Sequence, residues 1–159
     1  MQVSPLVWSA FLSLTPISEL RGGIPFAVAS GIPLIPAALW CVAWNALAAP
    51  IAYLFLATVH KLLYRWKRYA DFFDRFVEKA RGKVKKEVDK YGYWGILVFV
   101  GIPLPFTGAW TGTLGAWILG MDRKKATLAV AGGVLMAGAI VSLVVGLGVG
   151  ALSIFVKKV

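Results

Sequence analysis

Long apolar stretches dominate this chain. Residues 34–59 and 126–156 are almost continuously apolar. A helix rises 1.5 Å per residue, so about 20 residues cross the roughly 30 Å hydrocarbon core of a bilayer. Both stretches are therefore predicted to be transmembrane helices, the first with a kink at Pro50. The polar Asn45 is expected to face protein, and the small residues of the second stretch predict close packing against other helices.

The segment between these stretches has a different pattern. Across residues 60–90, apolar side chains recur at steps of three and four, which predicts an amphipathic helix. Lys61–Lys90 contains eleven Lys or Arg and five Asp or Glu, so the polar face of this helix is basic. Such a helix lies along a membrane surface or forms a cytoplasmic hairpin, and we predict a helical linker. His60 is interpreted as an ordinary interfacial residue.

Two further apolar stretches, residues 3–32 and 91–121, are interrupted in the middle. The breaks run over residues 15–25 and 101–108 and are rich in Pro and Gly. Each half is about 10–14 residues long, which is too short to span a bilayer and long enough to reach its midplane. Both stretches are predicted to be re-entrant helical hairpins, each of which returns the chain to the side from which it entered.

The two ends of the chain also resemble each other at an offset of 89 positions. The matched pairs include Pro16 and Pro105, Gly23 and Gly112, Ala27 and Ala116, Gly31 and Gly120, Ala37 and Ala126, and Ala48 and Ala137. One hairpin plus one span gives an odd number of crossings, so two tandem copies have opposite orientations. The predicted fold class is an all-α integral membrane protein with an inverted repeat. The predicted domains are a first repeat at 1–59, the linker at 60–90 and a second repeat at 91–159.

Composition and charge agree with a membrane protein. The chain has 159 residues, of which 59% are hydrophobic and only 15% charged, against about 25% charged in soluble domains. The net charge of +10 flanks the apolar stretches, which favours a cytoplasmic face near anionic lipid over nucleic-acid binding. We expect a multi-pass plasma-membrane protein with residues 60–90 and Arg123–Lys125 cytoplasmic. Lys157 and Lys158 would then lie outside.

The first break contains the two charges of the first 59 residues, Glu19 and Arg21. A charge at the bilayer centre costs at least ~2.5–3.5 kcal/mol, so a charged residue there is interpreted by default as part of a functional site. The Arg21 guanidinium offers a planar donor fork to an anion, and Gly22 and Gly23 would let backbone N–H groups approach it. Glu19 is expected to pair with Arg21 or to bind and release a proton. The structural alternative is a buried ion pair that only fixes the hairpin.

The second break has no charge but offers hydroxyl groups, an indole N–H and exposed backbone. Thr107, Gly108, Trp110 and Thr111 are candidates to complete a phosphate or carboxylate site that faces Arg21. The alternative is that they cap the broken helices and pack the tip. Asp122 is expected to cap the helix that follows it. The sequence has no nucleophile–His–acid set, metal-ligand cluster or nucleotide-binding glycine loop, so we expect neither an enzyme nor a cofactor.

Two segments carry a resemblance to a known family. SELRGGIP (18–25) and PLPFTGAWTGTLGA (103–116) resemble the signature motifs of the small multidrug export protein family, which is related to the DedA/VTT membrane-protein superfamily. Phe106 stands where that family's second motif has a glycine. The resemblance implies opposed re-entrant hairpins that meet within the bilayer, a key charged pair at Glu19 and Arg21, a tip shaped by Pro25, and transport.

Three hypotheses about function follow. The leading one is a transporter or flippase for an amphipathic anion such as a lipid phosphate, because relatives in the wider superfamily are associated with lipid flipping. Those relatives carry an arginine in the second hairpin, and this chain does not. The second is a proton-coupled exporter of hydrophobic cations, with Glu19 as the binding residue. The third is a non-transporting membrane scaffold. Membrane lipids are the expected partners, and a homodimer is expected because two spans and two hairpins enclose little space.

Overall fold

The structure is a computed structural model. The backbone is described for residues 4–104 and 107–156, and the side chains for all of these except 61, 76, 79–80, 82–87, 89 and 149–156. Pro105, Phe106, Lys157 and Lys158, which enter the sequence-based predictions, lie outside the described residues. Within the described part of the chain all regular structure is helical. The helices are α1 (Pro5–Leu14), α2 (Glu19–Ala29), α3 (Leu34–Ala46), α4 (Ala48–Ala57), α5 (Val59–Leu63), α6 (Lys67–Tyr91), α7 (Tyr93–Gly101), α8 (Ala109–Ile118) and α9 (Arg123–Val156).

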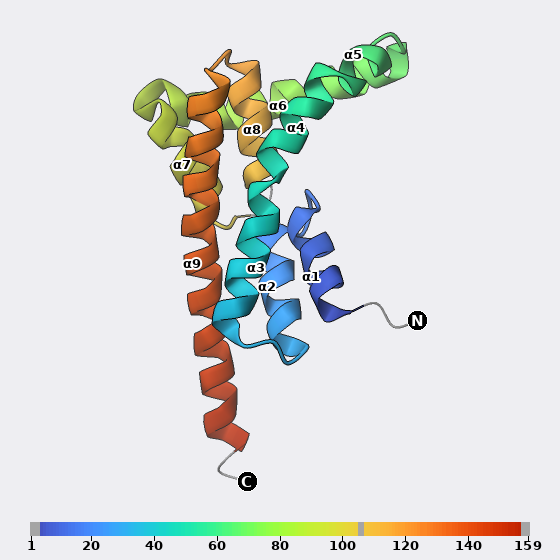
Figure 1. Cartoon of the computed structure of the whole chain (residues 1–159). Helices are drawn as coiled ribbons and strands as arrows, with labels where there is room; N and C mark the ends of the chain where they lie inside the picture. The colour runs from blue at the N-terminus through green and yellow to red at the C-terminus, as the bar shows by residue number, and fades with distance from the viewer. Residues whose placement is uncertain (1–3, 105–106, 157–159) are drawn as a thin grey trace.

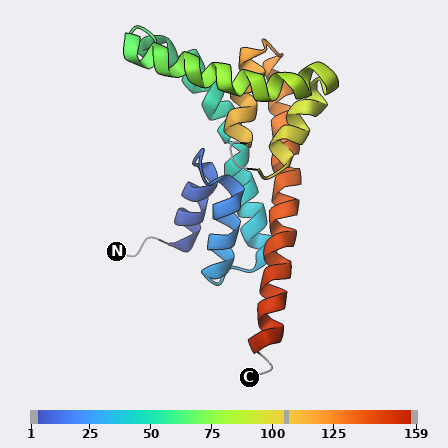
Figure 2. The same ribbon diagram turned by 180° about the vertical axis from the view of Figure 1, so that it is seen from behind.

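Two short helix pairs approach each other tip to tip beside two long helical segments (Figure 1). The α1–α2 pair has its connecting turn near the middle of the molecule, and the α7–α8 pair points its connecting loop toward it from the opposite end. The α3–α4 segment and α9 run in opposite directions and pack against each other. Figure 2 shows the same arrangement from behind, with α6 lying across one end of the molecule.

The first break is shorter than the sequence predicts. Only residues 15–18 are non-helical, and α2 continues through Pro25. The prediction that residues 19–25 belong to the break is therefore wrong. Gly23 lies within α2, where its missing side chain makes room for α1. A Cβ there would lie 3.1 Å from the Ser9 carbonyl oxygen. The second break, between Gly101 and Ala109, agrees with the prediction over its described residues.

The 89-residue offset reappears in how the helices end. Gly31 and Gly120 follow α2 and α8 with φ of +90° and +67°, the left-handed backbone that glycine adopts at low cost. Each helix closes with the same hydrogen bond, from the N–H after the glycine to the carbonyl five residues earlier: Ile32 to Ala27 at 3.1 Å and Met121 to Ala116 at 3.0 Å. These are Schellman caps. The next helices, α3 and α9, begin at Leu34 and Arg123, again 89 positions apart.

Two segments, Leu34–Ala57 and Arg123–Gly148, are long and apolar enough to cross a membrane. The first is interrupted at Leu47, three residues before the predicted kink at Pro50. Pro50 has no N–H to donate to the carbonyl of the preceding turn, so the helix is weakened on that side. In the second segment, Gly133 lets α9 approach α7 closely, because a Cβ there would lie 2.6 Å from the Val100 Cβ.

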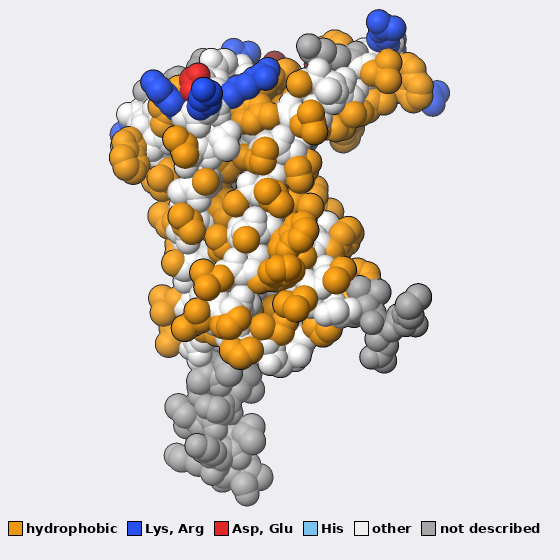
Figure 3. Space-filling view, viewed as in Figure 1, with side chains coloured by type: hydrophobic (Ala, Val, Ile, Leu, Met, Phe, Trp, Pro, Cys, Tyr) orange, Lys and Arg blue, Asp and Glu red, His pale blue; other side chains and the backbone are white. Residues whose placement is uncertain are grey.

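The predicted linker forms two helices. α5 ends at Leu63 and α6 begins at Lys67, so the amphipathic segment is broken over residues 64–66. Lys and Arg side chains gather at the end of the molecule that holds α6 and the start of α9, while apolar side chains cover the body (Figure 3). Asp122 accepts a hydrogen bond from the Lys125 N–H at 3.0 Å, which confirms the predicted helix cap.

His60 is part of a second core, contrary to its interpretation as an ordinary interfacial residue. Its ring is 7% exposed and lies 4.1 Å from the Phe73 ring centroid and 5.7 Å from that of Trp117. Its Nδ1 is 3.2 Å from the Tyr69 hydroxyl. The cluster joins the end of the first span to α6 and α8. Burial lowers the pKa of His60 below its usual range, and Asp74 opposes this shift only in part.

The lowered pKa of His60 predicts loss of stability in mild acid. The folded protein binds a proton at His60 more weakly than the unfolded chain does. The contribution of neutral, buried His60 to the free energy of unfolding is therefore complete above the ordinary histidine pKa of about 6.5 and declines as the pH falls below it. We expect the thermal unfolding midpoint of His60→Phe, which keeps an aromatic ring, to fall less than that of the wild type over this range. Parallel pH curves for the two proteins would contradict the prediction.

Candidate functional site

The site lies where the two helix-pair tips meet. Glu19 is the first residue of α2 and is 6% exposed, with a φ of +47°. This left-handed backbone costs a non-glycine residue roughly 1–2 kcal/mol and is tolerated where surrounding contacts hold it. Both carboxylate oxygens accept hydrogen bonds from the first turn of α8: Oε2 from the Ala109 N–H at 3.3 Å and Oε1 from the Trp110 N–H at 3.4 Å.

Arg21 makes the complementary contacts to the same tip. Its Nη1 donates to the Leu104 carbonyl, and its Nη2 donates to the Thr107 carbonyl at 3.0 Å. The hydrogen bonds of both charged side chains in the described structure therefore go to the second tip and not to each other. An acidic group lies at the N-terminus of α8, where a helix favours negative charge, and a basic group donates to two carbonyls of the loop that precedes it.

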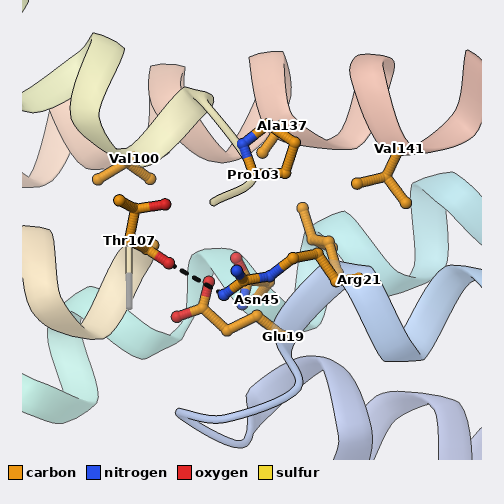
Figure 4. Close-up of a pocket in the computed structure, with 10 residues that line it drawn as sticks. Glu19, Arg21, Asn45, Val100, Pro103, Thr107, Ala137 and Val141 are labelled. Atoms are coloured by element: carbon orange, nitrogen blue, oxygen red, sulfur yellow. Dashed lines mark hydrogen bonds between the residues drawn. The ribbon is translucent and has the colours of Figure 1, made fainter. Parts of the chain in front are cut away.

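A small cavity surrounds these charges (Figure 4). Its volume is about 10 Å³, which is room for about one water molecule. Several lining residues are not among those predicted from the sequence, namely Leu20, Asn45, Val100, Pro103, Ala137 and Val141. Asn45 is 1% exposed and donates to the Ser13 carbonyl at 2.6 Å, which confirms that it faces protein. Its polarity within an apolar span was the signal that could have placed it in the site.

The remaining predicted residues of the first tip do not line the cavity. The Gly22 N–H donates to the Ser18 carbonyl at 3.3 Å, so it is not free for an anion. Gly23 packs against α1. Pro25 lies inside α2, where it cannot donate the usual helical hydrogen bond to the Arg21 carbonyl.

The four predicted residues of the second tip have different positions. The Thr107 hydroxyl donates within its own loop, to the Ile102 and Leu104 carbonyls. The Thr107 carbonyl accepts a hydrogen bond from Arg21. Gly108 has a φ of +145°, and a Cβ there would collide with the Glu19 carboxylate. The Trp110 indole N–H donates to the Leu14 carbonyl at 2.8 Å. Thr111 is half-buried in α8 and does not line the cavity.

This arrangement can hold and release charge within an apolar surround. The Glu19 carboxylate is an anion bound by backbone N–H groups with a guanidinium nearby, which is a combination that also binds phosphate or carboxylate ligands. Protonation would weaken both of its hydrogen bonds, because charge-assisted bonds are about twice as strong as neutral ones. Among the described residues, no three His, Cys, Asp or Glu side chains are grouped to hold a metal ion.

The fold and site define a class of protein. A chain with two membrane-length helical segments and a buried glutamate between apolar helices is typical of integral membrane proteins. The sequence matches the family described as "Putative small multi-drug export protein" over residues 19–140, and the chain belongs to that family. The match begins at Glu19, includes Arg21 and the second tip, and ends within α9. Comparison with curated proteins gave no match, and comparison with solved structures gave none either.

Proposed function

We propose that this chain is a proton-coupled membrane transporter for an amphipathic anion, such as a lipid phosphate. The observation that carries the proposal is the position of the Glu19 carboxylate, which occupies the N-terminus of α8 beside Arg21. In this scheme Glu19 is an internal anion that a substrate anion replaces. The family description names export, which supports transport as the activity.

The proposal includes a membrane arrangement. The helices of the two pairs have 9 to 11 residues, or roughly 14–17 Å at 1.5 Å per residue, which is about half of the hydrocarbon core. Each pair therefore acts as a re-entrant hairpin, and the two enter from opposite faces as an inverted repeat. The end that carries α6 and the start of α9 is cytoplasmic, in agreement with the positive-inside rule.

The transport cycle follows from competition for one position. When Glu19 is ionised, it occupies the α8 N-terminus and keeps the tips together. When Glu19 is protonated, its bonds to the Ala109 and Trp110 N–H groups weaken, and the head group of a substrate can replace it there. The Arg21 guanidinium binds the head group once the tips separate and its bonds to the Leu104 and Thr107 carbonyls break. Because the present cavity is about 10 Å³, the tips must separate before a head group enters. The apolar tail of the substrate stays against lipid.

We would test the anion site by thermal stabilisation of detergent-purified protein with two ligand panels. One panel holds polyprenyl phosphates and anionic lipids, and the other holds hydrophobic cations. A ligand that binds only the folded state raises stability by mass action. We expect stabilisation by the phosphates that is lost in Arg21→Gln and kept in Arg68→Gln, which removes an exposed charge on α6.

Two outcomes would oppose the proposal. Stabilisation by hydrophobic cations alone, kept or improved in Arg21→Gln, would assign binding to Glu19 and indicate cation export. A Glu19→Gln/Arg21→Gln protein with full cellular function would indicate a scaffold that does not transport. Either result would exclude Arg21 as the anion-binding group.

A further inference from the structure

The two tips hold each other through contacts that are related by the repeat. Arg21 and Trp110 are 89 positions apart, and each lies in the first turns of the second helix of its pair. Arg21 donates across to Leu104, and Trp110 donates across to Leu14 at 2.8 Å. The position equivalent to Leu104 is Thr15, one residue beyond Leu14. Each tip therefore uses the same position to donate a hydrogen bond to a carbonyl near the end of the opposing first helix.

We propose that Trp110 is the counterpart of Arg21: a neutral latch that keeps the end of α1 against α8 and so sets how readily the tips separate. The proposal rests on the proposed function, because it assigns a role to the tip contact in the transport cycle. The assignment differs from the sequence-based one, which made Trp110 a substrate-binding residue. Its indole N–H is already used by a carbonyl of the opposite hairpin, and Trp110 does not line the cavity.

The Arg21 and Trp110 contacts differ in charge, so they should respond differently to pH and salt. The Arg21 contact is charged, and it lies next to the group that we propose to titrate. The Trp110 contact is neutral, so neither protonation of Glu19 nor added salt weakens it directly. The cavity around Glu19 is lined by residues from α2, α3, α7 and α9 and from the second tip, namely Leu20, Arg21, Asn45, Val100, Pro103, Thr107, Gly108, Ala137 and Val141. Arg21 is the charged group among them.

Loss of the indole donor should therefore make opening easier at every pH. Without this hydrogen bond the closed state is less stable, so the tips separate at a lower degree of Glu19 protonation. A typical net hydrogen-bond contribution corresponds to a shift of about 0.4–1 pH unit in the opening midpoint, toward higher pH. The direction matters more than the size, because general destabilisation of the fold would lower the unfolding midpoint without moving a titration of tip exposure.

Hydrogen–deuterium exchange of the full chain in lipid nanodiscs tests this without any substrate. The readout is exchange of peptides that cover residues 11–20 and 107–113, measured over a pH series and corrected for intrinsic exchange rates. The variant Trp110→Phe keeps the aromatic ring and removes the donor. The matched control is Trp94→Phe, the same change at a tryptophan of α7 that is 72% exposed. We expect several-fold faster exchange at both tips and a raised pH midpoint in Trp110→Phe, and wild-type behaviour in Trp94→Phe.

A third variant, Trp110→Gln, returns an N–H donor without the ring and should move exchange back toward that of the wild type. The proposal is overturned if Trp110→Phe and Trp94→Phe behave alike, or if Trp110→Gln is more open than Trp110→Phe. If Trp110→Phe does not fold, comparison of Trp110→Gln with the wild type decides in the same assay, because unchanged tip exchange supports the donor and faster exchange opposes it. A wild type whose tip exchange does not respond to pH would contradict proton gating, which is a separate failure from that of the latch.

Discussion

Replacement of Glu19 by glutamine is expected to remove the pH dependence of transport while the protein stays folded. Glutamine has the shape of protonated glutamate, so the variant is held permanently in the state with weakened bonds to Ala109 and Trp110. Reconstituted vesicles loaded with a fluorescent amphipathic phosphate would report the rate. Between about pH 5.5 and about pH 8, the wild-type rate should change by up to roughly tenfold per pH unit, the limit for one proton, and the variant rate should be constant.

The control for this experiment is Glu78→Gln, which neutralises an exposed carboxylate on α6. It should keep the wild-type pH profile, because it is not part of the tip contact. A Glu19→Gln protein that transports with an unchanged pH profile would show that the titrating group lies elsewhere. A protein with no transport at any pH would mean that Glu19 must ionise to displace the substrate, and the expected constant rate of the variant would be wrong.

Replacement of Gly108 by alanine is expected to be among the most destabilising single changes in the chain. The backbone at Gly108 has a φ of +145°, and the new Cβ would collide with the Glu19 carboxylate. Backbone strain and overpacking together predict a loss of about 2–4 kcal/mol in the free energy of unfolding, measured by denaturant titration in mixed micelles. Gly120→Ala is a control without a collision and should be less destabilising, because Gly120 has a φ of +67° and a Cβ added there would meet nothing within 4 Å.

A double-mutant cycle identifies the collision. In the background of Glu19→Ala the carboxylate is absent, so Gly108→Ala should cost only its own backbone strain. The two changes should therefore be non-additive by at least about 1 kcal/mol, as is typical of residues in direct contact. Additive losses would mean that Glu19 does not touch Gly108, and the proposed arrangement of the tips would have to be abandoned.

Charge isolation made part of the site predictable. Glu19 and Arg21 stand alone in 59 residues, and the cost of charge in lipid marks such residues whatever the fold. Their partners were not predictable, because backbone carbonyls and N–H groups have no sequence signal. The expected Glu19–Arg21 pair was a reasonable default for opposite charges two positions apart. In the structure, Glu19 instead accepts hydrogen bonds at the N-terminus of α8, and Arg21 donates to carbonyls of the loop that precedes α8.

The fold was predictable where the lengths of the apolar segments and the positions of the helix-breaking residues agree. The apolar lengths of residues 34–59 and 126–156 gave the two long segments, and the second break gave the gap between α7 and α8. The first break was overestimated because Gly22, Gly23 and Pro25 favour a break locally, and packing of α2 against α1 overrides that preference. His60 was misread because its burial depends on the turn that folds α6 back against α5 and on Trp117 of α8, which is distant in the sequence.

The gathering of basic side chains at one end of the molecule has a consequence for biosynthesis. The first 59 residues contain one acidic and one basic residue, Glu19 and Arg21, so they carry almost no information about their own orientation in the membrane. Charges on later segments can fix the topology of earlier ones. The first half is therefore expected to take its final orientation only after α6 has been translated, and a chain truncated before residue 60 should insert in both directions.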